Sequence, residues 1–200
     1  MRLFQSAFLK VSTGPVWKEP GLAFWFGLSF VAPFYFGLVS LFYAMSFDYI
    51  VQDDARLHVV WWQQLVDLEL FVGDAIAHYF TAIQPLGFKW IYGAAVGLGI
   101  KPLMRAKVLP LLLALVATVY LFWAALLILS VPMCGFLTTL LLNQNIWIRD
   151  DLIAASPRSF VYPLFSAFLY YLLKGSKVAC LVTLGLLGLF YPQMMLVGFG

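Results

Sequence analysis

The longest stretch of this chain without a charged side chain lies between Lys107 and Arg149 and comprises residues 108–148. This run of 41 residues is too long and too apolar for the core of a soluble protein of 200 residues. A helix needs about 20 residues to cross about 30 Å of hydrocarbon, so the run can supply one span and part of another. The sequence therefore predicts a membrane protein.

Composition supports the same class. Hydrophobic residues make up 64% of the chain and charged residues 10%, whereas an average globular domain has about 25% charged residues. Backbone groups in a bilayer must bond to one another, which leaves helices or closed barrels. Long apolar runs favour helices, because barrel strands alternate over about ten residues. The net charge of +3 is too small for a nucleic-acid surface, so we expect no direct nucleic-acid binding.

The apolar runs predict an all-α, polytopic transmembrane protein that forms one domain over residues 1–200. Four spans are expected, between Glu19 and Asp48, at 108–131, at 159–173 and from 178 onward. The last two would form a helical hairpin, and snorkelling of the flanking cations would extend the short third span. Residues 1–21 are expected to lie at the membrane surface as an amphipathic segment.

Pro132 divides the long uncharged run. We expect the second span to end there and residues 135–148 to continue out of the bilayer after a proline kink. A re-entrant half-helix is the alternative. The continuation would carry Asn143, Asn145, Arg149 and Asp150 to the membrane surface, where they are candidate partner contacts.

Residues 48–107 form an amphipathic connecting region. From residue 63 to 81 a helical pattern places Asp67, Asp74 and His78 roughly on one polar face. A fifth span over 68–88 would give 9 basic residues inside and 3 outside, whereas four spans give 5 inside and 7 outside, against the usual cytoplasmic excess. Intramembrane ionisable groups are costly, however, so we favour four spans and an amphipathic middle segment.

The spacing of Asp74 and His78 suits a metal site or a proton relay, because residues four apart share a helix face. The polar face of a surface helix explains the pair more simply, and we predict no metal and no cofactor. Asp150 and Asp151 follow a span end, where ion pairing or capping is expected. No common catalytic or nucleotide-binding motif is present, so we expect no enzyme activity.

Three short motifs follow one another in the C-terminal half. Arg105 and Lys107 precede the long apolar run, the polar stretch 143–150 ends in Arg-Asp, and Ser-Phe-Val-Tyr at 159–162 enters the terminal hairpin. This arrangement resembles integrating-conjugative-element membrane proteins, which are encoded beside the coupling protein of conjugative type IV secretion systems. The chain has Asn-Gln-Asn where that family usually has Asp-Gly. The resemblance implies an accessory of DNA or protein transfer in the bacterial inner membrane, without catalytic residues.

Three functions remain as hypotheses. The first is a non-enzymatic subunit that contacts the lipid bilayer and other membrane-protein subunits, with a type IV coupling protein as the implied partner. Its candidate contacts are Asn143, Asn145, Arg149, Asp150, Asp67, Asp74 and His78. The second is a small transporter or ion-translocating subunit, which needs Asp67, Asp74 or His78 inside a span that faces a cavity. The third is an accessory subunit of a respiratory or photosynthetic complex, with pigment or quinone against its many aromatic side chains.

Overall fold

The computed structural model describes residues 21–48 and 52–199, and every regular element within them is helical. The elements are α2 Leu22–Leu28, α3 Val31–Met45, α4 Asp53–His58, the 3₁₀ helix η2 Val60–Leu65, α5 Ala75–Ala82, α6 Leu86–Gly97, α7 Pro102–Ile128, α8 Pro132–Ile148, the 3₁₀ helix η3 Pro157–Phe160, α9 Val161–Leu173, α10 Lys177–Phe190 and α11 Pro192–Phe199. The all-α prediction is confirmed for these residues. The predicted surface segment, 1–21, lies outside them apart from Gly21.

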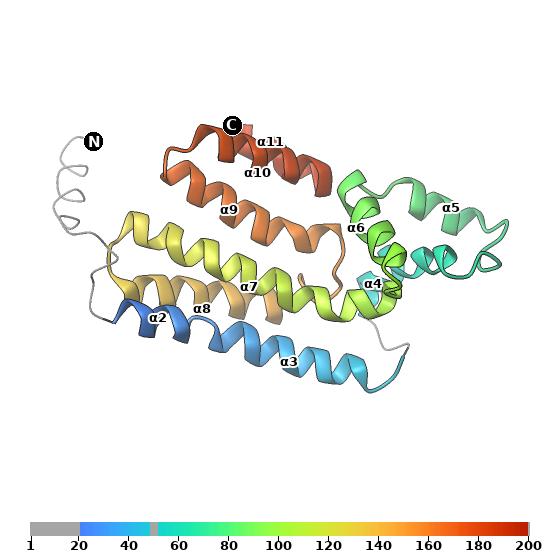
Figure 1. Ribbon diagram of the computed structural model, residues 1–200, viewed down its shortest axis with the longest axis horizontal. Coiled ribbons are helices and arrows are strands. Elements are labelled where there is room, and N and C mark those ends of the chain that lie inside the picture. Colours follow the sequence, from blue (N-terminus) through green and yellow to red (C-terminus); the bar gives the residue numbers. More distant parts are fainter. Residues whose placement is uncertain (1–20, 49–51, 200) are drawn as a thin grey trace.

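The helices form two parts, which Figure 1 shows side by side. Helices α2, α3, α7, α8, α9, α10 and α11 lie roughly along one direction and are called the bundle here. The elements α4, η2, α5 and α6 (residues 53–97) gather at one end of it and are called the cap. Helix α7 is central, because it packs against α3, α8 and α9.

Two helical segments have the length and apolarity to cross a membrane: 22–45, with 24 residues, and α7, with 27. They lie antiparallel, since Phe26 packs on Phe122 near one end and Lys107 bonds to the carbonyl of Phe47 near the other. Helices α9 and α10 have only 13 and 14 residues. At about 1.5 Å per residue they fall short of about 30 Å of hydrocarbon, so length and composition support two of the four predicted spans.

Helix α8 folds back along α7, and the expected continuation out of the bilayer is wrong. The ring of Phe122 lies against Gly135, and Asn143 bonds to Thr118, so the two helices are antiparallel. Pro132 does not kink a continuous helix but begins a new one, because its missing amide hydrogen is harmless at a first helical position. At Gly135 a Cβ atom would lie 2.7 Å from the Phe122 ring, so only glycine allows this close approach.

The prediction of one polar helix from residue 63 to 81 is also wrong. Helix η2 ends at Leu65, and the chain turns through Phe71 and Gly73, which have φ angles of +61° and +76°. The Asp74 carboxylate then accepts hydrogen bonds from the amides of Ile76 and Ala77 at 2.8 and 3.1 Å. This N-cap starts a new helix of eight residues. No continuous helix covers 68–88 in the described chain, so a fifth span is not formed there.

The predicted C-terminal hairpin is present as α9 and α10, which pack on each other across a turn at Gly175 (φ +74°). The final apolar run is divided, however. Helix α10 ends at Phe190, and Pro192 begins α11, which returns along α10 with Met195 against Gly188. The sequence alone predicted one helix over this region.

Candidate partner-binding surface

The structure separates the seven predicted contact residues into three places. Asn143 is completely buried between α7 and α8, where its amide donates to the Thr118 hydroxyl and to the Thr139 carbonyl, both at 2.9 Å. Its side chain cannot meet a partner unless the two helices separate. The assignment of Asn143 as a contact residue is therefore corrected: it joins two helices of the bundle.

The second place is the end of α8, where Asn145 and Arg149 are exposed. Asp150 is half-buried, has a φ angle of +60° and accepts a hydrogen bond from the Gln52 amide at 2.6 Å. This contact joins the connection after α8 to the residue that caps α4. Sequence reasoning missed Gln52, because 98 residues separate it from its partner.

Asp151 fastens the start of α9 to the same connection. Its carboxylate pairs with Arg158 at 2.7 Å and accepts the Tyr162 hydroxyl at 2.6 Å. The predicted ion pairing is thus confirmed for Asp151, whereas Tyr162 was not foreseen in this role. Because the Arg158 side chain is 57% exposed, the ion pair itself contributes at most about 1 kcal/mol.

An aromatic cluster attaches the cap to the bundle. Phe88 packs on Phe160, which stacks on Phe190 with ring centroids 4.4 Å apart. Tyr92 is fully buried, and its hydroxyl donates to the carbonyl of Ala155 at 3.3 Å. Burial raises the pKa of Tyr92 well above its ordinary value, so the hydroxyl keeps the proton that it donates. The cap is therefore a firmly held platform.

The third place is an outward part of the cap, residues 65–83, which we call the α5 surface. Asp67 is exposed and accepts a hydrogen bond from the Glu69 amide at 3.1 Å. Asp74 and exposed His78 line one hollow of about 560 Å³. The predicted common helix face is not formed, because Asp74 caps the helix instead of standing within it.

The α5 surface exposes large apolar side chains as well. Leu68 is 82% exposed and Val72 79%, and Ile76 and Tyr79 are also mostly exposed. Single exposed apolar residues are ordinary, but a concentration of them outside the span-length segments is a candidate interaction site. Sequence periodicity could not find it, because these residues lie in an irregular turn and a short helix.

The charge of this surface is negative. Asp67, Glu69 and Asp74 carry three acidic groups, whereas Lys89 brings one cation to the edge of the surface by donating to the Ala82 carbonyl at 3.0 Å. The described residues contain no group of three or more His, Cys, Asp or Glu side chains that could hold a metal ion. An apolar surface with acidic groups is suited to bind a complementary surface that carries Lys or Arg.

The three acidic groups and His78 lie outside both span-length segments. The transporter hypothesis needed them inside a span that faces a cavity, so its sequence support is lost. Comparisons with protein-family models, with curated proteins and with solved structures find no match to this chain. The resemblance to conjugative-element membrane proteins therefore stays a prediction that rests on its motifs.

Proposed function

We propose that this chain is a non-enzymatic, integral-membrane subunit that docks on a larger complex through the α5 surface. The observation that carries the proposal is the exposure of Leu68 and Val72 beside three acidic groups, on a platform outside both span-length segments. Insertion of this surface into lipid would bring its carboxylates towards the hydrocarbon at high cost. A protein partner with an apolar surface and basic neighbours satisfies both features.

The bundle is proposed to be the membrane-embedded part. The segment 22–45 and α7 cross the bilayer, while α8, α9 and α10 lie beside them as shorter helices. Four full crossings would require the last helices to be extended by snorkelling at Arg158 and Lys174. Support for embedding comes from the many apolar side chains that the bundle leaves exposed, including Val39, Phe42 and Leu141.

The distribution of basic residues favours a cytoplasmic cap. Nine Lys and Arg residues lie in the described ranges. Seven belong to the cap or to the helix ends next to it: Arg56, Lys89, Lys101, Arg105, Lys107, Arg149 and Arg158. Only Lys174 and Lys177 lie at the other end, in the turn between α9 and α10. Among the described residues this bias supports a cytoplasmic cap by the positive-inside rule. It differs from the sequence count because α8 turns back, which moves Arg149 and Arg158 to the cap end, and because Arg2, Lys10 and Lys18 lie outside the described residues.

The family resemblance supplies the partner in this proposal, a type IV coupling protein in a bacterial inner membrane. The test is copurification of the tagged full chain with the coupling protein encoded beside it, in mild detergent. Val72→Glu should reduce recovery of the coupling protein about tenfold, because a charge is placed in the centre of an apolar contact. Val72 is so exposed that the substitution should leave the fold intact.

Leu57→Glu is the matched control, because it makes the same chemical change on α4, outside the α5 surface. Leu57 is also exposed, so its variant should retain the coupling protein at the wild-type level. Recovery of the wild-type chain as a lone monomer would refute the proposal, as would equal recovery with Val72→Glu.

A further inference from the structure

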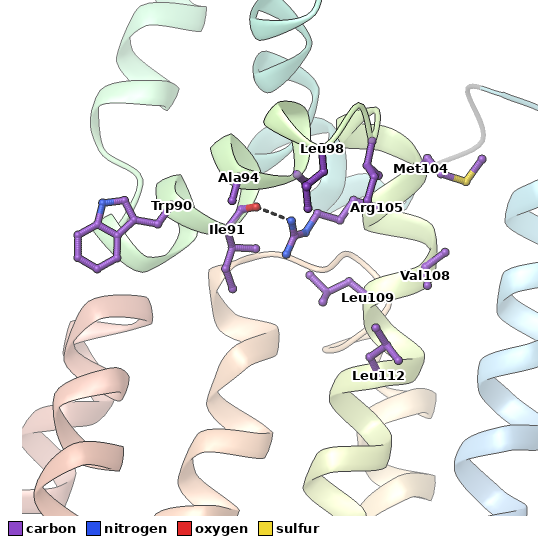
Figure 2. A pocket seen from close by; sticks show the side chains of 11 residues that line it. Trp90, Ile91, Ala94, Leu98, Met104, Arg105, Val108, Leu109 and Leu112 are labelled. Atoms are coloured by element: carbon purple, nitrogen blue, oxygen red, sulfur yellow. Dashed lines mark hydrogen bonds between the residues drawn. The ribbon is translucent and has the colours of Figure 1, made fainter.

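A cavity of about 720 Å³ opens between α6 and the first turns of α7, and Figure 2 shows the side chains that line it. Ten of its eleven lining residues are apolar, among them Ile91, Leu98 and Leu109, and the remaining one is Arg105. The volume lies within the range of about 300–1,000 Å³ that is common for small-molecule sites. An apolar cavity with one cation is suited to an amphiphile that carries a negative charge.

Arg105 has no acidic counter-charge in this cavity. Its guanidinium donates to the carbonyl of Ile91 and lies over the ring of Tyr92, 5.3 Å from the ring centre. No carboxylate of the described residues forms an ion pair with it, and its buried Nε has no hydrogen-bond partner there. A guanidinium in apolar surroundings gains from a phosphate, because it can form charge-assisted and bidentate hydrogen bonds with that group.

The start of α7 adds to the positive potential at the same point. Lys101 directly precedes this helix of 27 residues, so a second cation stands next to the first turn of α7 in the sequence. The first turn contains no acidic residue, and no side chain caps it. The free amides of a helix N-terminus favour an anion.

The cavity also has the direction that a membrane lipid requires. From Arg105, the lining residues Val108, Leu109 and Leu112 continue along α7 towards the middle of this span-length helix. Seven residues of helix cover about 10 Å. A headgroup at Arg105 would therefore lie at the membrane surface while its acyl chain follows α7 inward.

We propose that this cavity binds one anionic phospholipid of the surrounding bilayer, with its phosphate at Arg105 and the first turn of α7, and an acyl chain along Val108, Leu109 and Leu112. The proposal rests on membrane embedding of the bundle but not on the α5 surface or its partner. It is tested on the isolated full chain, so its failure is distinct from a failure to copurify with the coupling protein.

The experiment is native mass spectrometry of the full chain released from detergent and titrated with phosphatidylglycerol or phosphatidylcholine of identical acyl chains. The wild type should bind phosphatidylglycerol about tenfold more tightly, because only this lipid has a net negative headgroup. Arg105→Gln should remove the preference and Arg105→Lys should retain it. Lys177→Gln, which removes one exposed cation at the far end of the bundle, is the matched control and should change nothing.

Ala94→Phe tests the apolar part of the site independently of charge, because Ala94 lines the cavity. A phenyl ring there should weaken binding of both lipids, whereas soluble glycerol phosphate should not displace phosphatidylglycerol. Equal binding of the two lipids by the wild type would overturn the proposal, and so would wild-type binding by Arg105→Gln or by Ala94→Phe. Displacement of phosphatidylglycerol by glycerol phosphate would also overturn it.

Discussion

The side-chain amide of Asn143 donates a hydrogen bond to the hydroxyl of Thr118 at 2.9 Å, with both side chains fully buried between α7 and α8. This contact fixes the register of the two helices at a point where apolar side chains alone would permit sliding. The Thr118 hydroxyl also donates to the Ala114 carbonyl of its own helix at 2.8 Å. A polar contact of this kind explains how the uncharged run 108–148 can form a hairpin with a defined register.

Removal of this contact should destabilise the bundle. Asn143→Ala and Thr118→Val should each lower the free energy of unfolding, and a double-mutant cycle should give a coupling of about 0.6–2 kcal/mol. The measurement is equilibrium unfolding of the purified chain in mixed detergent micelles. Strictly additive effects would show that the hydrogen bond does not contribute to stability.

The close approach at Gly135 gives a second prediction. Gly135→Ala should lower the free energy of unfolding by about 1–3 kcal/mol, because the new methyl group overlaps the Phe122 ring and overpacking forces neighbouring atoms to move. Gly93→Ala in α6 is the control, because its Cβ would meet no atom within 4 Å. Gly93→Ala should leave the free energy of unfolding unchanged or raise it by about 0.5–1 kcal/mol, as expected for alanine in a helix interior. Equal effects at the two positions would contradict the packing of α8 on α7.

The cap should lose stability in mild acid through His58. Burial lowers the pKa of His58 below its ordinary value of 6.5, against the opposing effects of Asp54 and of the contact with Gln84. The folded chain thus binds this proton less readily than the unfolded chain. The stability contribution of neutral His58 is complete above pH 6.5 and declines as the pH falls from 6.5 through the lower folded-state pKa.

Thermal unfolding at a series of pH values between about 7.5 and 5 measures this effect. His58→Gln should flatten the decline in unfolding temperature, because glutamine has no proton to gain. His78→Gln is the control at an exposed position and should keep the wild-type slope. An unchanged slope in His58→Gln would assign the pH dependence to other groups.

Topology can be measured with single cysteines after replacement of the free Cys134 and Cys180 by alanine. With a cytoplasmic cap, Leu57→Cys, which is exposed on α4 outside the α5 surface, should react with a membrane-impermeant maleimide only in inside-out vesicles. Ser176→Cys, in the turn between α9 and α10, should react in intact cells. Labelling of both positions from the same side would exclude an arrangement in which α9 begins at the cap and crosses to the opposite surface.

The candidate site was predictable only in part. The spacing of Asp74 and His78 predicted a shared helix face, and in the structure both residues line one hollow at the start of α5. The spacing could not reveal that Asp74 caps a new helix. The helix predicted from residue 63 to 81 is interrupted by the left-handed backbone at Gly73, and the Asp74 side chain caps α5 directly after it. Asn143 was misplaced because its polarity suggested a surface, while its partner Thr118 is distant in sequence.

The sequence by itself determined the helical class and the two long apolar segments, because helix formation and transfer into hydrocarbon depend on local composition. Only the tertiary structure decided that α8 reverses at Pro132, that residues 53–97 form a cap and that Arg105 lines an apolar cavity. These features depend on contacts such as Phe122 with Gly135, where side-chain shape and distant partners decide the path of the chain. Hydropathy cannot distinguish a helix that continues from one that turns back, because both bury the same apolar residues.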